Sequence, residues 1–165
     1  MDWSGLRGIL RILNNHNLCF LYIGRKSEES KIFRWYYNIL LRHYKTKYGL
    51  EINFKNVGSG FSLLHAYNIT INPQAKLGND VTIFKGATVG SIRSGKNAGV
   101  PTIGDRVTIC CNAFLCGNIT IGNDVLIAAN SYVNFDVPDN SIVIGNPGII
   151  KHKQDPSRDY LFELT

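Results

Sequence analysis

Cysteine is scarce in this chain, and the placement of the few cysteines excludes a protein held together by disulfides. None of the four forms a C-x-x-C pair, and two are adjacent in sequence: Cys19, Cys110, Cys111 and Cys116. The regular cysteine spacing of small secreted domains is missing. We therefore expect reduced thiols in a protein of the cytoplasm.

Long hydrophobic runs and a basic leader are also missing. The apolar run at residues 18–23 is too short to cross a bilayer, because a spanning helix needs about 20 apolar residues. The sequence starts Met1-Asp2-Trp3, without the positive residues that open a signal peptide. These features predict a cytoplasmic protein with no membrane span.

Acidic residues are outnumbered, with 18 Lys and Arg against 12 Asp and Glu and a formal net charge of +6. This surplus favours three kinds of anionic partner, namely nucleic acid, an anionic membrane surface or a small phosphorylated ligand. The chain has no basic motif interleaved with aromatic residues of the kind that stacks on bases, and no zinc-finger spacing. Nucleic acid is therefore not expected as a partner.

What the sequence does contain is a six-residue repeat of aliphatic side chains. The repeat runs through positions 71–89, resumes at 103 and continues to 133: Ile71, Leu77, Ile83, Val89, Ile103, Ile109, Leu115, Ile121, Ile127 and Val133. An α-helix would give a period of 3.6, and a half-buried strand would alternate strictly. A six-residue period is typical of the hexapeptide β-helix, in which three hexads complete one triangular coil. An antiparallel sandwich is the less favoured alternative, because its turn signals come every 8–12 residues.

The repeat divides the chain into three expected parts: an α-helical cap at 1–49, a β-helix at 50–150 and a C-terminal tail at 151–165. The repeat is interrupted between Val89 and Ile103 by an eight-residue insertion that lies within residues 91–101. Insertions of this kind commonly build the binding face of repeat proteins, so we expect a loop that projects from one corner. The tail from Asp155 onward is expected to be loosely held.

Two helices are expected in the cap. The first falls within residues 1–24 and is interrupted by the polar residues 14–17. The second is expected to start after an N-cap at Ser27 and to end at Gly49. Apolar and aromatic residues recur on it at helical spacing: Ile32, Trp35, Tyr36, Ile39 and Leu40. Its basic face is expected to be solvated, with contact to a membrane-bound or phosphorylated acceptor as the alternative: Lys31, Arg34, Arg42 and Lys45.

Residues 50–150 resemble the hexapeptide-repeat acyltransferases in three features. These are the hexads themselves, the loop before Pro101-Thr102-Ile103-Gly104, and the closing Gly145-Asn146-Pro147-Gly148. The likeness is strongest to the serine acetyltransferases and to the related O-acetyltransferases of bacterial surface-polysaccharide clusters. The resemblance implies a left-handed parallel β-helix, which is an exception to the usual handedness of parallel crossovers. It also implies acetyl-CoA as the donor and a homotrimer with active sites between neighbouring subunits.

The resemblance assigns the catalytic role to His65, in Ser62-Leu63-Leu64-His65-Ala66-Tyr67. An imidazole with a pKa of about 6.5 can take the proton of a hydroxyl group as its oxygen attacks a thioester. Glu51 stands where the family has an acceptor-binding Asp. Three roles stay open for Glu51, which are to orient His65, to bind the acceptor, or to be an ordinary surface carboxylate. Carbonic anhydrases of the same fold hold their metal with three histidines, and the repeat here offers one, so no metal is expected.

For the donor, the resemblance points to small residues on the outside of the coils and to lysines near them. The pantetheine arm is expected beside three positions: Ser91, Cys111 and Ala129. The CoA phosphates are expected to meet Lys96 in the loop and Lys151 or Lys153 in the tail. A thiolate nucleophile at Cys110, Cys111 or Cys116 would give a covalent acetyl-enzyme. No histidine is adjacent to these cysteines in the matching coils, so we expect them to be structural.

The sequence therefore predicts an acetyl-CoA-dependent O-acetyltransferase that acts by direct attack of an acceptor hydroxyl. Two departures from the serine acetyltransferase pattern favour a sugar of a bacterial surface polysaccharide, or its precursor, as the acceptor. Leu64 replaces an Asp before the catalytic histidine, and Gly99-Val100 replaces an Arg-His pair before the proline. Serine acetylation in cysteine synthesis is the first alternative, and a non-catalytic β-helix scaffold is the second.

Overall fold

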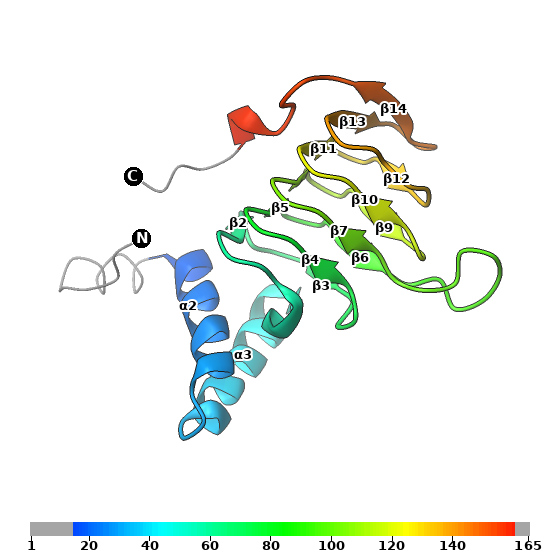
Figure 1. Cartoon of the computed structure of the whole chain (residues 1–165). Coiled ribbons are helices and arrows are strands. Elements are labelled where there is room, and N and C mark those ends of the chain that lie inside the picture. Colours follow the sequence, from blue (N-terminus) through cyan, green and yellow to red (C-terminus); the bar gives the residue numbers. More distant parts are fainter. Residues whose placement is uncertain (1–14, 161–165) are drawn as a thin grey trace.

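A parallel β-helix makes up most of the protein, and a computed structural model describes its residues 15–160 (Figure 1). Each coil contributes a short strand to each of three faces. Sheet A contains β1 (Leu50–Glu51), β3 (Ile69–Ile71), β6 (Thr88–Gly90), β9 (Phe114–Cys116) and β12 (Tyr132–Val133). Sheet B contains β4 (Lys76–Leu77), β7 (Thr102–Ile103) and β10 (Thr120–Ile121). Sheet C contains β2 (Ser62–Leu64), β5 (Thr82–Phe84), β8 (Thr108–Ile109), β11 (Val125–Ile127) and β13 (Ser141–Ile144), with the antiparallel strand β14 (Ile149–His152) at its edge.

The aliphatic residues of the six-residue repeat fill the interior of the coils. Parallel pairing places each one on its counterpart in the next coil, as where Ile83 pairs with Ile109 and Ile109 pairs with Ile127. All ten repeat residues are at most 5% exposed. Because burial of aliphatic side chains is the main stabilising contribution to a fold, this column explains why the coils form. The stacking that the repeat predicts is confirmed.

Two helices form the cap, but the boundary between them is not where the sequence predicts it. The first, α2, spans His16–Glu29, and the second, α3, spans Arg34–Tyr48. Ser27 is not an N-cap, because it lies inside α2, where its buried hydroxyl donates to the carbonyl of Gly24 at 2.7 Å. The chain turns after Ser30 instead, whose hydroxyl oxygen accepts from the backbone N–H of Phe33.

The ends of the two helices follow the expected local chemistry. Gly49 terminates α3 in the left-handed conformation with φ of 67°, as predicted. The polar residues that were expected to interrupt the first helix instead start α2, because the side chain of Asn15 accepts from the N–H groups of Asn17 and Leu18. The part of the expected first helix at residues 1–14 lies outside the described residues.

Helix α2 closes the open end of the β-helix. Phe20 is 1% exposed and its ring lies 5.4 Å from that of Phe54, in the short 3₁₀ turn Phe54–Asn56 below the first full coil. A side chain at Gly24 would collide with the same Phe54 ring, so the glycine permits this close packing. Arg25 donates to the carbonyls of Val57 and Gly58, and burial lowers the pKa of its guanidinium. The stacked interior is therefore covered at this end by α2, with side chains of α3 packed beside it.

The C-terminal segment packs against sheet C, so the expectation of a loosely held tail is wrong for residues 155–160. Pro156 is buried and Ser157 is 0% exposed, and the Ser157 hydroxyl lies 3.4 Å from the Asp124 carboxylate. Tyr160, in the 3₁₀ turn Arg158–Tyr160, meets the Phe84 ring edge to face at 6.3 Å. These contacts between distant residues have no signal in the local sequence. The remaining residues 161–165 lie outside the described part of the chain.

Within residues 15–160, neither helix is long and apolar enough to cross a membrane.

Candidate active site

His65 lies on the corner that joins sheet C to sheet A in the first complete coil. Its side chain is exposed and points away from the packed interior. Leu64 pairs with Phe84 of the next coil on sheet C, and Thr70 pairs with Thr88 on sheet A. Five residues lie between Leu64 and Thr70, whereas only three lie between Phe84 and Thr88. The corner of His65 is therefore two residues longer than its neighbour, which lifts this imidazole out of the regular coil.

The backbone of His65 is in a conformation that few residues other than glycine adopt. Its φ is 52°, in the left-handed region. Nine non-glycine residues of the described chain have positive φ, and apart from His65 and Arg106 all of them are Asn or Asp. Asn and Asp tolerate this region well and occupy the ordinary corners of the coils. The cap packs against this corner of the coil.

Residues of the cap contact the two residues that follow His65. The side-chain oxygen of Asn17 accepts from the backbone N–H of Ala66 at 3.2 Å. The Tyr67 ring packs against those of Tyr48 and His16, at 5.5 and 5.2 Å between centroids. Sequence reasoning missed these residues, because nothing in the local sequence shows that the start of α2 reaches this corner.

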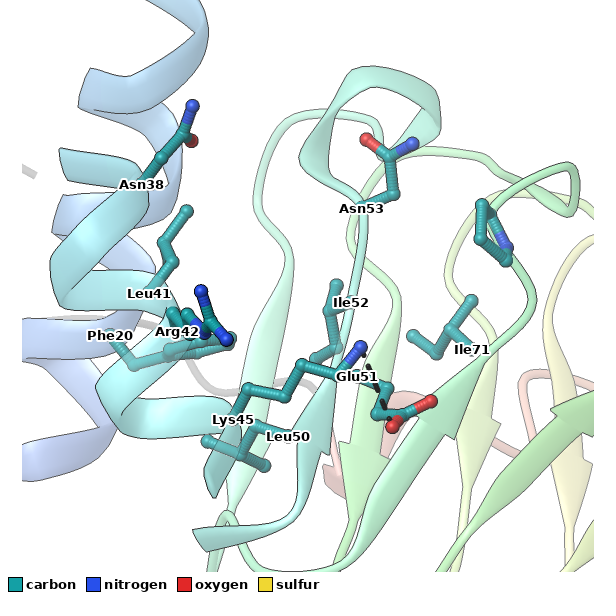
Figure 2. A pocket seen from close by; sticks show the side chains of 11 residues that line it. Phe20, Asn38, Leu41, Arg42, Lys45, Leu50, Glu51, Ile52, Asn53 and Ile71 are labelled. Carbon is teal, nitrogen blue, oxygen red and sulfur yellow. Dashed lines mark ion pairs between the residues drawn. The ribbon is translucent and has the colours of Figure 1, made fainter. Parts of the chain in front are cut away.

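The side chain of Glu51 contacts helix α3 and not His65. It is the second residue of β1, and its carboxylate forms an ion pair with Lys45 of α3 at 3.5 Å. Figure 2 shows both side chains at a pocket between α3 and the first coil, with Arg42 on the same helix. The pocket has a volume of about 390 Å³. Among residues 15–160, no hydrogen bond or ion pair joins Glu51 to His65, so its assignment as an orienting or acceptor-binding residue stays a prediction.

The residues expected at the donor lie on two different corners of one chain. Cys111 and Ala129 follow β8 and β11 and stack in adjacent coils on the corner between sheets C and A, the same corner as His65. Ser91 and Lys96 lie on the corner between sheets A and B, where the insertion leaves the coil after β6. Within one subunit, the structure therefore does not bring these two groups together.

The insertion forms the projecting loop that the sequence predicts (Figure 1). Ile92 and Gly99 pair as an antiparallel bridge at its base, with N···O distances of 3.0 and 2.9 Å. The side chain of Asn97 donates to the carbonyl of Asn134 at 3.0 Å, which fastens the loop to the last coils. The remaining candidate, Lys151, lies exposed on β14 at the edge of sheet C.

Burial disfavours two of the coil thiols, those of Cys110 and Cys116, as nucleophiles. Cys110 is partly buried, and burial, followed by the nearby Cys111, raises the pKa of its thiol to about 11. Cys116 is buried, and its sulfur lies 3.5 Å from the hydroxyl of Tyr132. Because the thiolate is the reactive form, a raised pKa makes Cys110 a poor nucleophile at neutral pH. Across the described residues, no group of three or more His, Cys, Asp and Glu side chains is placed to bind a metal ion.

Comparison with known proteins relates this chain to acetyltransferases. The family model for the bacterial transferase hexapeptide (six repeats) matches residues 101–134. The serine acetyltransferase of Bacillus subtilis is 36% identical over 114 residues, which cover 67% of this chain and 52% of that protein. The serine acetyltransferase of Mycobacterium tuberculosis is 40% identical over 103 residues, which cover 61% and 44% of the two chains. This chain thus spans about half the length of these relatives.

Solved structures agree with the sequence comparison. The crystal structure of Neisseria gonorrhoeae serine acetyltransferase in complex with serine superposes with a TM-score of 0.72 and 29% identity, covering 91% of this chain and 62% of that one. The serine O-acetyltransferase from Brucella melitensis also gives a TM-score of 0.72, at 26% identity, covering 93% and 62%. The expected fold class, a left-handed parallel β-helix with an N-terminal helical cap, is confirmed.

The raised pKa of Cys110 predicts slow alkylation at neutral pH. We expect its rate of reaction with iodoacetamide to rise with pH and to level off near 11 rather than near the usual value of 9.0, because the thiol stays protonated below its pKa. Tandem mass spectrometry of the alkylated peptide separates Cys110 from the adjacent Cys111. A rate that is already constant at pH 9 would contradict the burial of this thiol.

Proposed function

We propose that this chain, a hexapeptide-repeat protein similar in sequence and fold to the serine acetyltransferases, is an acetyl-CoA-dependent O-acetyltransferase. The observation that carries the proposal is the position of His65. It matches the catalytic histidine of the family, and in this structure it is exposed on a lengthened corner outside the packed coil. A structural histidine would instead be expected to pack against its own coil.

In the proposed reaction, His65 acts as a general base. Its imidazole takes the proton from the acceptor hydroxyl as that oxygen attacks the carbonyl carbon of the thioester. A backbone N–H near the loop stabilises the tetrahedral oxyanion. The intermediate collapses with cleavage of the C–S bond, and the proton on His65 passes to the leaving sulfur, so CoA departs as the free thiol. The protonated thiol of Cys110 supports this direct transfer over an acetyl-cysteine intermediate.

A site that uses all the candidate residues needs more than one chain. His65 and Ala129 share one corner of the coil, whereas Ser91 and Lys96 lie on another. A homotrimer in which the loop corner of one subunit faces the His65 corner of its neighbour would unite them. This division of the candidates supports the proposal of active sites between subunits, with CoA lying along the shared groove.

The comparisons favour serine as the acceptor, which was the alternative in the sequence analysis, over a surface-polysaccharide sugar. The relatives reported above are named as serine acetyltransferases, and one solved neighbour holds serine. The pocket beside Glu51 adds support, because Arg42 and Lys45 offer positive charge and Glu51 offers negative charge. A zwitterion such as serine needs both signs.

A sugar hydroxyl is the second candidate, and the loop carries the observation that favours it. Gly99 has φ of 141°, and a β-carbon there would lie 2.8 Å from that of Asn118. The loop is therefore built without a side chain at this position, where the serine enzymes have an Arg. Leu64 likewise brings no carboxylate beside His65.

Replacement of His65 by Ala tests the proposed function. We expect turnover to fall by about 10²–10⁴-fold, the contribution typical of a general base, with the fold unchanged because the side chain is exposed. Release of the CoA thiol, followed with a chromogenic disulfide, measures turnover. His43→Ala is the matched control, since His43 is an exposed histidine on α3. Equal turnover of the His65→Ala and control variants would remove His65 from the mechanism.

The acceptor is identified by the same thiol-release assay. We expect serine to accelerate release from acetyl-CoA above the rate in buffer, and a panel of free sugars and nucleotide sugars to have little effect. Mass spectrometry of the product should show one acetyl group on the serine oxygen. Acceleration by a sugar and not by serine would replace serine with the second candidate while leaving the transferase proposal in place.

The contact between Asn17 and Ala66 predicts that the cap positions His65. Asn17→Ala removes the acceptor for the Ala66 N–H, and we expect kcat to fall about ten-fold, as for loss of one part-buried hydrogen bond. Asn17→Asp keeps an acceptor oxygen and should restore most of kcat. It should also move the acidic limb of the pH profile upward, because a nearby carboxylate favours the protonated imidazole. Equal kcat in the wild type and the Ala variant would contradict this role.

A further inference from the structure

Helix α3 exposes its most apolar side. None of its residues is buried, and five large side chains at and before its first turns are 47–78% exposed: Ile32, Phe33, Trp35, Tyr36 and Ile39. We call these five residues the aromatic face. On the opposite side, Leu41, Tyr44 and Tyr48 pack against the core. Contiguous exposed apolar surface of this kind marks an interaction site more often than a chance arrangement.

The aromatic face lies at the end of the helical pair that is remote from His65. The corner of His65 contacts Asn17 and Tyr48, at the start of α2 and the end of α3. The turn between the two helices carries Ile32 and Phe33, and Figure 1 shows this turn at the tip that projects away from the coils. The face is therefore separate from the proposed active site.

The cap also carries most of the net positive charge of the protein. Residues 16–48 contain seven Lys and Arg against two Glu, so this fifth of the chain supplies five of the six net positive charges. Close to the aromatic face, Lys31 is exposed, and Arg34 bonds only to the backbone carbonyl of Glu28 among its recorded contacts in residues 15–160. Of the two acidic residues, Glu29 is paired with Lys26 at 2.8 Å. The turn beside the aromatic face therefore carries a small net positive charge, with Lys26, Lys31 and Arg34 against Glu28 and Glu29.

We propose that the aromatic face of the cap docks on an anionic lipid surface. Trp and Tyr favour the boundary between water and lipid, because each has an apolar ring and a polar group. Flanking Lys and Arg are attracted by anionic headgroups, and the isoleucines enter the apolar layer beneath the headgroups. The cap lies on the membrane in this arrangement and does not cross it.

Charge decides between a membrane and a second copy of this chain. Two caps that met through this face would bring together two helical pairs that each carry a net charge of +5, which opposes their association. An anionic surface has the complementary sign. The same argument predicts that added salt weakens the docking.

Sedimentation with vesicles tests the proposal on the full chain. We expect binding to vesicles of phosphatidylcholine and phosphatidylglycerol in equal parts, and little binding to phosphatidylcholine alone. The double variant Trp35→Ser, Ile39→Ser keeps every charge and should bind about ten-fold or more weakly. Ile149→Ser is the matched control, because Ile149 is 63% exposed on β14, and it should bind like the wild type. Lys31→Gln and Arg34→Gln should each weaken binding about five-fold.

Two results would overturn the proposal. The first is wild-type protein that stays in solution with the anionic vesicles. The second is equal binding by the wild type and the Trp35→Ser, Ile39→Ser variant, which would show that charge alone holds the protein there. Analytical ultracentrifugation without lipid completes the test. A smaller assembly for the double variant, together with no vesicle binding by the wild type, would assign the face to contact between copies.

Discussion

The stacking of aliphatic side chains in the interior of the coils is the constraint on which the rest of the structure depends. Each inward residue packs on its counterpart one coil away, and a shift by one residue would turn the whole column outward. The register is therefore fixed along the chain. The insertion does not disturb it, because Val89 still pairs with Leu115 across the loop. Fixed register is also what decides which outward residues share a corner, and thus which residues can share a site.

A stack of this kind leaves an apolar surface at each end, and the end near His65 is closed by a helix. Phe20 covers the first turn of the interior, and Gly24 allows the helix to approach closely. Asn17, the second residue of the same helix, accepts a hydrogen bond from the backbone of the residue after His65. Helix α2 therefore both covers the end of the solenoid and contacts the corner of the candidate base. This couples the stability of the cap to the geometry of that corner.

The sequence predicts the parts of this structure that repeat and misses the parts that depend on single contacts. The hexads give the coils, their interior and the projecting loop, and Gly49 gives the end of α3, because each signal is local. Ser27 misleads because a serine can satisfy its hydroxyl inside a helix as well as at its start. The packing of Ser157 on Asp124 and of Asn17 on Ala66 joins residues 33 and 49 positions apart, and no periodicity marks such pairs. The regular hexads begin only after His65, so periodicity does not place this residue on a corner, and only a resemblance gives it a role.

The aromatic residues of the cap are buried or partly buried near the coils and exposed at the tip. At the base, Phe20, Tyr44 and Tyr48 meet the coils and one another, and the aromatic rings there are partly or wholly buried. At the tip, rings of similar size are exposed and stand among lysines and arginines. Within residues 15–160, the packing that joins the helical pair to the solenoid lies at the base, and the exposed apolar residues at the tip lie away from it. In the proposed docking, the apolar residues at the tip would meet a lipid surface, and the lysines and arginines beside them would favour one that is negative.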